Sequence, residues 1–178
     1  KVGSPKVGHG KMILDSLNKL GVYTVDLYTP FWDAKWFDER LGALYLNDDT
    51  HWTPRGAEMA ADLISEKVRR MMADSVVNLG VEKMKYKVQD SLADRMGDIG
   101  EMSGLNKFNT FKVQQVVGHV VSPFKDDFRK SKILILGDSF SRIYQTDAPV
   151  NAGWIAHFAK NMNRPVASLV SDGDASTL

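Results

Sequence analysis

Residues 132–139 read Lys-Ile-Leu-Ile-Leu-Gly-Asp-Ser and change from an apolar run to turn-forming residues. The branched apolar run at 132–136 is typical of a strand buried on both faces. A Gly-Asp-Ser turn would end this strand abruptly. Ligands of open α/β sheets collect at the carboxyl ends of the strands, so Ser139 is a candidate nucleophile. On its own, however, the triplet is also an ordinary turn.

The composition is that of a globular protein. The 178 residues suit one domain spanning 1–178, and 43% hydrophobic residues provide a sizeable core. The 23 Lys and Arg balance 22 Asp and Glu. This balance predicts no nucleic-acid partner, although an anionic polysaccharide could still be held by a few arginines. We expect no cofactor.

The chain contains no cysteine, which excludes disulfides, thiolate metal sites and cysteine nucleophiles. No apolar run reaches the roughly 20 residues that cross a bilayer, so we expect no transmembrane segment here. The sequence begins at Lys1 and ends soon after a predicted strand. We therefore expect a fragment truncated at both ends, with room for an anchor or signal outside it.

Hydrophobic periodicity predicts an α/β fold. Helices are predicted at residues 11–20, with Gly21 as a cap, and at 53–72 and 152–162. Strands are predicted at residues 22–27, 111–117, 132–136 and 166–170. This alternation favours a parallel sheet. Residues 73–110 are interpreted as an insertion or surface excursion, with a helix through Met84, Val88 and Leu92.

Residues 30–46 are rich in aromatic side chains, including Trp32, Trp36 and Tyr45. Aromatic rings on a loop could stack on sugars. Burial of the rings against the core is the simpler interpretation, because large aromatics are mostly buried. The four-residue spacing of Trp32 and Trp36 fits one helical face.

Residues 49–56 read Asp-Thr-His-Trp-Thr-Pro-Arg-Gly. Thr53 can cap a helix, and Pro54 fits the first helical position. Asp49 and His51 are thereby placed on the loop before a helix, where active-site residues are common.

These residues could form a catalytic triad. A serine hydroxyl needs a base such as neutral histidine, and a carboxylate holds the imidazole in one tautomer. Asp49 lies two residues before His51, on the same side of an extended loop. Asp48 lies three before it and is the alternative orienting acid; we favour Asp49. The amide of Ser139 is a candidate oxyanion donor.

Other side chains are weaker candidates. Arg142, Tyr144 and Trp52 could contact the substrate, although Arg142 is also explained by a surface or packing role. The remaining histidines, His9, His119 and His157, do not cluster with each other, and no metal site is predicted.

The two blocks, residues 49–56 followed by 137–144 (Gly-Asp-Ser-Phe-Ser-Arg-Ile-Tyr), resemble the AlgJ/AlgX type of alginate O-acetyltransferase, which has an SGNH-hydrolase-like domain. Ordinary SGNH hydrolases carry the serine block first, whereas this order is reversed in both the chain and the group. Residues 171–178 also resemble the segment after the last helix in AlgJ-like proteins. The separate Gly and Asn blocks of SGNH hydrolases have no clear match.

The resemblance implies a flavodoxin-like three-layer sandwich with a mainly parallel central sheet. It implies a periplasmic O-acetyltransferase that uses Ser139, His51 and Asp49 to acetylate an exopolysaccharide such as alginate. A membrane O-acyltransferase partner would deliver the acetyl donor, and an absent segment could tie the protein to the inner membrane. The alternatives are an SGNH-type carbohydrate esterase or deacetylase and a non-catalytic polysaccharide-binding scaffold.

Overall fold

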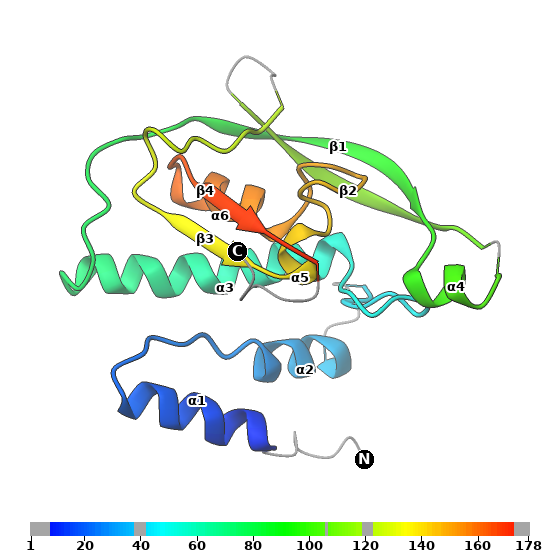
Figure 1. Ribbon diagram of the computed structural model, residues 1–178, viewed down its shortest axis with the longest axis horizontal. Coiled ribbons are helices and arrows are strands. Elements are labelled where there is room, and N and C mark those ends of the chain that lie inside the picture. The colour runs from blue at the N-terminus through cyan, green and yellow to red at the C-terminus, as the bar shows by residue number, and fades with distance from the viewer. Residues whose placement is uncertain (1–7, 38–41, 106, 119–122, 173–178) are drawn as a thin grey trace.

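The computed structural model describes residues 8–37, 42–105, 107–118 and 123–172. Its helices are α1 (His9–Lys19), α2 (Tyr28–Phe37), α3 (Pro54–Ala73), α4 (Asp98–Met102), α5 (Ser139–Arg142) and α6 (Trp154–Met162). Its strands are β1 (Tyr86–Arg95), β2 (Asn109–Gly118), β3 (Leu134–Gly137) and β4 (Ala167–Val170). In Figure 1 the β1–β2 hairpin arches over α6 and α3, and α1 and α2 lie below α3.

The four strands form two separate pairs. β3 and β4 are parallel, with Leu134 opposite Ala167 and Gly137 opposite Val170. β1 and β2 form an antiparallel hairpin in which Arg95 lies opposite Asn109. Within the described ranges, parallel pairing is confined to β3 and β4, so the fold is mixed α/β.

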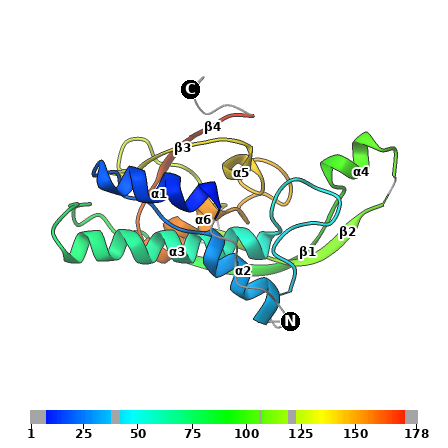
Figure 2. The same ribbon diagram turned by 90° about the horizontal axis from the view of Figure 1, so that it is seen from below.

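Small and branched apolar residues form the core between α3 and α6. Ala57, Ala60 and Ala61 of α3 are fully buried, and so are Ile155 and Ala159 of α6. Small side chains let two helix backbones approach closely. Figure 2 shows α6 beside α3, and Figure 1 shows α1 below α3, on the side away from α6. Accordingly, α1 buries none of its residues.

The predicted start of α3 is confirmed. Thr53 is its N-cap: the hydroxyl of Thr53 accepts a hydrogen bond from the Gly56 amide at 3.1 Å, and Pro54 is the first helical residue. The helix at 152–162 and the strands at 111–117 and 166–170 are also found. Gly21 follows α1 with a φ of +82°, the left-handed conformation expected of a glycine after a helix.

The predicted strand at 22–27 is wrong. These residues form no strand, and Val22 and Tyr23 are exposed. A strand needs a hydrogen-bonding neighbour, and in the described part of the chain none pairs with this segment.

The predicted helix through Met84, Val88 and Leu92 is also wrong, because Val88 and Leu92 lie in β1 and Met84 lies just before it. A spacing of four residues fits one face of a helix and equally one face of a strand. The pairing with β2 decides between the two.

The strand before Ser139 is β3, but it is not buried on both faces as predicted. Ile135 and Gly137 are buried, whereas Leu134 and Leu136 are 57% and 59% exposed. The aromatic segment is partly helical: α2 contains Trp32 and Trp36, and Phe31 is buried in the core. His119 and residues 173–178 lie outside the described residues.

Of the described helices, none combines the length and apolar character needed to span a bilayer.

His157 of α6 gives the fold a dependence on pH. Its side chain is 1% exposed, and its Nε2–H donates to the Gln114 carbonyl at 2.9 Å. Burial, with a contribution from Lys160, lowers the pKa of His157 to about 4. The unfolded chain binds this proton below a pH of about 6.5. The neutral His157 therefore contributes to the free energy of unfolding above pH 6.5, and this contribution is lost as the pH falls towards 4.

We predict that His157→Gln, which keeps a donor for Gln114, flattens the loss of stability between pH 6.5 and 4. The wild type should lose up to about 3 kcal/mol more than the variant over this range. Urea unfolding at several pH values measures the difference. Burial also raises the pKa of Glu58, which favours the folded state as the pH falls. This contribution opposes that of His157 and is present in both proteins. Equal pH dependence in the two proteins would contradict the prediction.

Candidate active site

The loop before α3 is folded tightly by its own backbone. Tyr45 and Trp52 form an isolated antiparallel bridge, and the Thr53 amide donates to the Leu44 carbonyl at 2.9 Å. The Thr53 hydroxyl donates to the Ala43 carbonyl at 2.8 Å. Residues 46–51 therefore form the tip of a short hairpin that carries Asp49 and His51.

Asp49 and His51 are in direct contact. One carboxylate oxygen of Asp49, Oδ1, lies 2.7 Å from His51 Nδ1 and also accepts the His51 amide at 2.9 Å. The side chain of Asp49 is fully buried, and that of His51 is 13% exposed. A carboxylate in this position holds the proton on Nδ1 and leaves Nε2 as the basic nitrogen.

Arg95 was missed by sequence reasoning. It ends β1, and its Nε donates to the second oxygen of Asp49, Oδ2, at 3.2 Å. A single arginine in a polar segment gives no sequence signal, and only the register of the hairpin places it at the site.

Asp48, the alternative orienting acid, does not bind His51; its side chain binds Asn109 instead. Its Oδ1 accepts from the Asn109 side chain at 2.7 Å, and its carbonyl accepts the amides of Ile99 and Gly100 at 3.0 and 3.1 Å. Gly97 lies so close that a Cβ there would be 2.0 Å from the Asp48 carbonyl oxygen. Asp48 thus joins the loop to α4, and Asp49 is the acid that contacts the imidazole.

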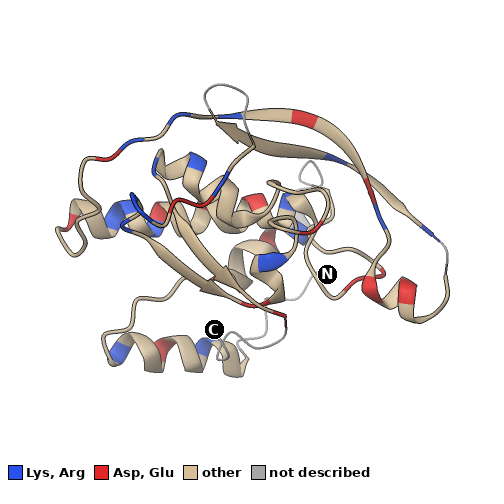
Figure 3. Cartoon of the chain, turned by 45° about the horizontal axis from the view of Figure 1, so that its top comes forward, with Lys and Arg blue, Asp and Glu red and all other residues tan. Residues whose placement is uncertain are grey.

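A second carboxylate lies beside the pair. Asp98 Oδ2 is 3.8 Å from His51 Nδ1 and accepts the Thr50 hydroxyl at 2.5 Å. Burial opposes ionisation of Asp98, but hydrogen bonds from Thr50 and Ile99 outweigh it and lower its pKa. Figure 3 shows the acidic positions of α4, coloured red on the ribbon, at the end of the hairpin.

Asp49, His51 and Asp98 bring their ligand atoms within 4.8 Å of one another, a geometry that could hold a metal ion. The donor set fits a cation poorly. Both oxygens of Asp49 already accept hydrogen bonds, one of them from the positively charged Arg95.

Ser139 begins α5, directly after β3. Asp138 caps this helix by accepting the Phe140 amide at 3.0 Å. Gly137 is required here, because a Cβ would lie 2.2 Å from Ser141 Oγ. Ser139 itself is half-buried. Its carbonyl accepts the Ile143 amide at 2.9 Å, whereas its hydroxyl makes no hydrogen bond to another described residue.

The turn that bears Ser139 (the serine half of the site) and the loop that bears Asp49 and His51 (the histidine half) meet through aromatic rings. Phe140 follows Ser139, and its ring centroid lies 4.9 Å from that of His51 and 5.3 Å from that of Trp52. Ser139 is thereby brought to the neighbourhood of His51 without a hydrogen bond between them. Catalytic hydrogen bonds are often long without substrate and shorten in the reactive complex.

The three predicted substrate contacts occupy different positions. Tyr144 is fully buried and donates its hydroxyl to the Trp52 carbonyl at 3.1 Å, and Trp52 is 7% exposed. Arg142 donates to Asp172 at 2.6 Å and pairs with Asp147. These positions suit a structural role for Tyr144 and Trp52, while the Arg142 side chain is 31% exposed.

Comparisons with known proteins point to one family. A family model described as "SGNH hydrolase-like domain, acetyltransferase AlgX" matches residues 4–175. The probable alginate O-acetylase AlgJ of Pseudomonas putida is 45% identical over 49 residues, which are 28% of this chain and 12% of that protein. The probable alginate O-acetylase AlgJ of Pseudomonas syringae pv. tomato is 32% identical over 74 residues, a match that covers 39% of this chain and 18% of that protein.

Solved structures show the same fold. The O-acetyltransferase domain of P. putida AlgJ matches with a TM-score of 0.68 at 19% identity, covering 97% of this chain and 56% of that one. Pseudomonas aeruginosa AlgX matches with a TM-score of 0.61 at 15% identity, covering 92% of this chain and 35% of the AlgX chain. The chain thus spans about half of the AlgJ domain and about a third of AlgX. Because the family match takes in nearly every residue, the chain belongs to the AlgX family of SGNH-hydrolase-like acetyltransferase domains.

Proposed function

We propose that this chain is the catalytic domain of an O-acetyltransferase that acts on an exopolysaccharide such as alginate. The observation that carries the proposal is the buried contact between Asp49 and His51, 2.7 Å long, beside the turn that bears Ser139. The names of the AlgJ relatives, probable alginate O-acetylases, supply the substrate class.

The proposed reaction has two displacements. His51 Nε2 removes the hydroxyl proton of Ser139 as its oxygen attacks the acetyl carbonyl of the donor. The leaving group departs with that proton, and acetyl-Ser139 remains. A sugar hydroxyl, deprotonated by His51, then attacks this ester, and the proton returns to Ser139. Asp49 stabilises the imidazolium in both steps, and the Ser139 amide is proposed as one oxyanion donor.

An acceptor chain needs an open surface near the loop. A hollow of about 580 Å³ is lined by residues of α2 and by residues 42–47, among them Tyr45, which is 49% exposed. Exposed aromatic rings suit the apolar faces of sugars. We propose this hollow as one part of the acceptor cleft.

The remaining proposals concern context. We propose a periplasmic protein that receives acetyl through a membrane O-acyltransferase partner and is tied to the inner membrane by a segment outside this chain. We also propose that β3 and β4 belong to the mainly parallel sheet of a three-layer sandwich.

The nucleophile is tested by covalent labelling. We expect a serine-directed fluorophosphonate to label the wild type and not Ser139→Ala, with Ser141→Ala as a matched control that still labels. Intact-mass spectrometry measures the adduct, and circular dichroism checks the fold. A folded wild type that stays unlabelled would favour the non-catalytic scaffold.

The orienting acid is tested by two neighbouring substitutions. Asp49→Asn removes the charge that stabilises the imidazolium, and we expect kcat for release of acetyl from an aryl acetate to fall by about 10³ to 10⁴. Asp48→Asn keeps an acceptor for Asn109, so kcat should change less than about threefold. Similar losses in both variants would count against Asp49 as the orienting acid.

The acceptor separates transferase from esterase. With an aryl acetate as donor, we expect added mannuronate oligosaccharides to become acetylated by the wild type and not by Ser139→Ala. Mass spectrometry of the oligosaccharide detects the product. Release of acetate to water, unchanged by the oligosaccharide, would instead identify an SGNH-type esterase.

A further inference from the structure

The hairpin contributes a cation to the candidate site. Arg95 lies at the end of β1, where Figure 1 shows the hairpin descending towards the loop before α3. Its side chain is 19% exposed, and its Nε donates to Asp49 Oδ2 at 3.2 Å. The other oxygen of Asp49 is occupied by His51. The carboxylate is thus held at both oxygens, by the imidazole on one side and by a permanent cation on the other.

We propose that Arg95 is a positioning residue, which supplies the counter-charge of the buried Asp49 carboxylate and keeps it aimed at the Nδ1–H of His51. A fully buried carboxylate without a counter-charge tends to take up a proton, because burial disfavours the charged form. A protonated Asp49 could not stabilise an imidazolium. Arginine is suited to this task because its charge persists at every physiological pH.

Arg95 also contacts Tyr144, a residue that follows the helix beginning at Ser139. Its guanidinium lies over the ring of Tyr144, 5.7 Å from the centroid, an arrangement that favours a cation. The Tyr144 hydroxyl donates to the carbonyl of Trp52, the residue after His51. Contacts therefore run in a closed ring from His51 through Asp49, Arg95 and Tyr144 back to Trp52.

The register of the hairpin supports the same inference. Arg95 lies opposite Asn109, and these two residues contact consecutive residues of the loop: Arg95 binds Asp49 and Asn109 binds Asp48. Two neighbouring carboxylates are thus each fixed by one strand of the hairpin. Residues 73–110, interpreted from sequence as a surface excursion, support the candidate site.

This inference rests on the proposed function, and its test uses two readouts. The first is the pH profile of kcat/KM for an aryl acetate. Arg95→Met removes the charge at similar length, so the acid limb should move upwards by about one pH unit, equivalent to about a tenfold loss of rate on that limb. Arg95→Lys restores a cation and should recover most of this shift. Added methylguanidine should partly rescue Arg95→Ala.

The second readout needs no activity. The Nδ1 proton held between His51 and Asp49 should give a downfield proton NMR signal in the wild type, assigned by its absence from His51→Gln. Arg95→Met should weaken or abolish the signal, and Arg95→Lys should retain it. This arm decides the role of Arg95 even if the wild type transfers no acetyl group.

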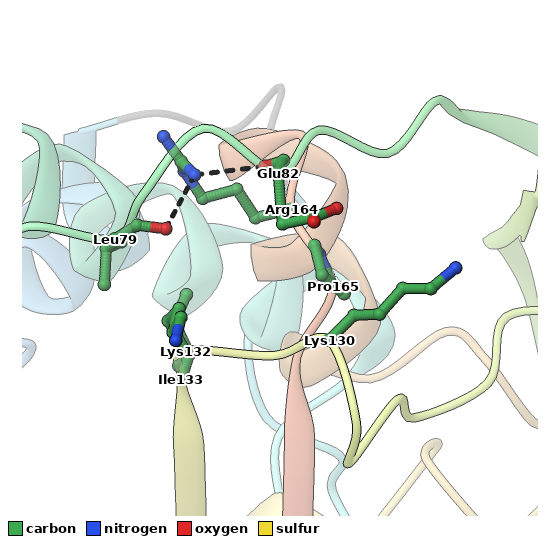
Figure 4. A pocket seen from close by; sticks show the side chains of 7 residues that line it. All are labelled: Leu79, Glu82, Lys130, Lys132, Ile133, Arg164 and Pro165. Carbon is green, nitrogen blue, oxygen red and sulfur yellow. Dashed lines mark hydrogen bonds between the residues drawn. The ribbon is translucent and has the colours of Figure 1, made fainter.

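Arg164→Met is the matched control. Figure 4 shows Arg164 donating to the carbonyls of Leu79 and Glu82, both at 3.0 Å, with no part in the ring around Asp49. Its loss should lower thermal stability and leave both the pH profile and the NMR signal unchanged.

The outcomes separate the two ideas. If Ser139→Ala abolishes turnover while Arg95→Met keeps the wild-type pH profile and NMR signal, the role of Arg95 is overturned and the proposed function stands. If the wild type is inactive but the signal depends on a cation at position 95, the positioning role stands and the proposed function fails. An Arg164→Met protein that shows the same changes as Arg95→Met would reduce the effect to general destabilisation.

Discussion

The arrangement of the candidate site depends on a buried charge, the carboxylate of Asp49. A buried anion is costly unless it is paired and hydrogen-bonded. Here three donors meet that requirement: two groups of His51 and the guanidinium of Arg95. Because Arg95 comes from β1, the chain must form the hairpin in the correct register before the carboxylate is satisfied. The chemistry of one side chain therefore constrains the position of a distant strand.

Register is a strict condition for this pairing. Successive residues of a strand point to opposite faces, so a slip of β1 by one residue against β2 would turn Arg95 to the face opposite that of Asn109, and the two could no longer both contact the loop. The pair Arg95–Asn109 and the close approach of Gly97 to Asp48 fix the same end of the hairpin. Exposed polar pairs along the ladder, such as Asp90 with Gln114, contribute at other positions.

The sequence predicts features whose causes are local. Thr53 and Pro54 mark the start of α3 because a cap and a first-turn proline act within one turn. The Gly-Asp-Ser turn is found because Gly137 admits no side chain there. Features that need a distant partner are not predicted: residues 22–27 look like a strand but pair with nothing described, and residues 86–95 form a strand only because β2 pairs with them. Arg95 belongs to this second class.

The two halves of the candidate site, the loop with Asp49 and His51 and the turn with Ser139, are held in different ways. Asp49 and His51 are fixed by directional hydrogen bonds on a tight loop. The segment that bears Ser139 meets that half through the ring of Phe140, which contacts His51 and Trp52, and through the Tyr144 hydroxyl, which donates to the Trp52 carbonyl. Ring contacts lack the strict geometry of hydrogen bonds and tolerate small sliding movements. The imidazole is therefore preorganised by its acid, whereas the Ser139 hydroxyl is not fixed by a hydrogen bond to any residue that the structure describes.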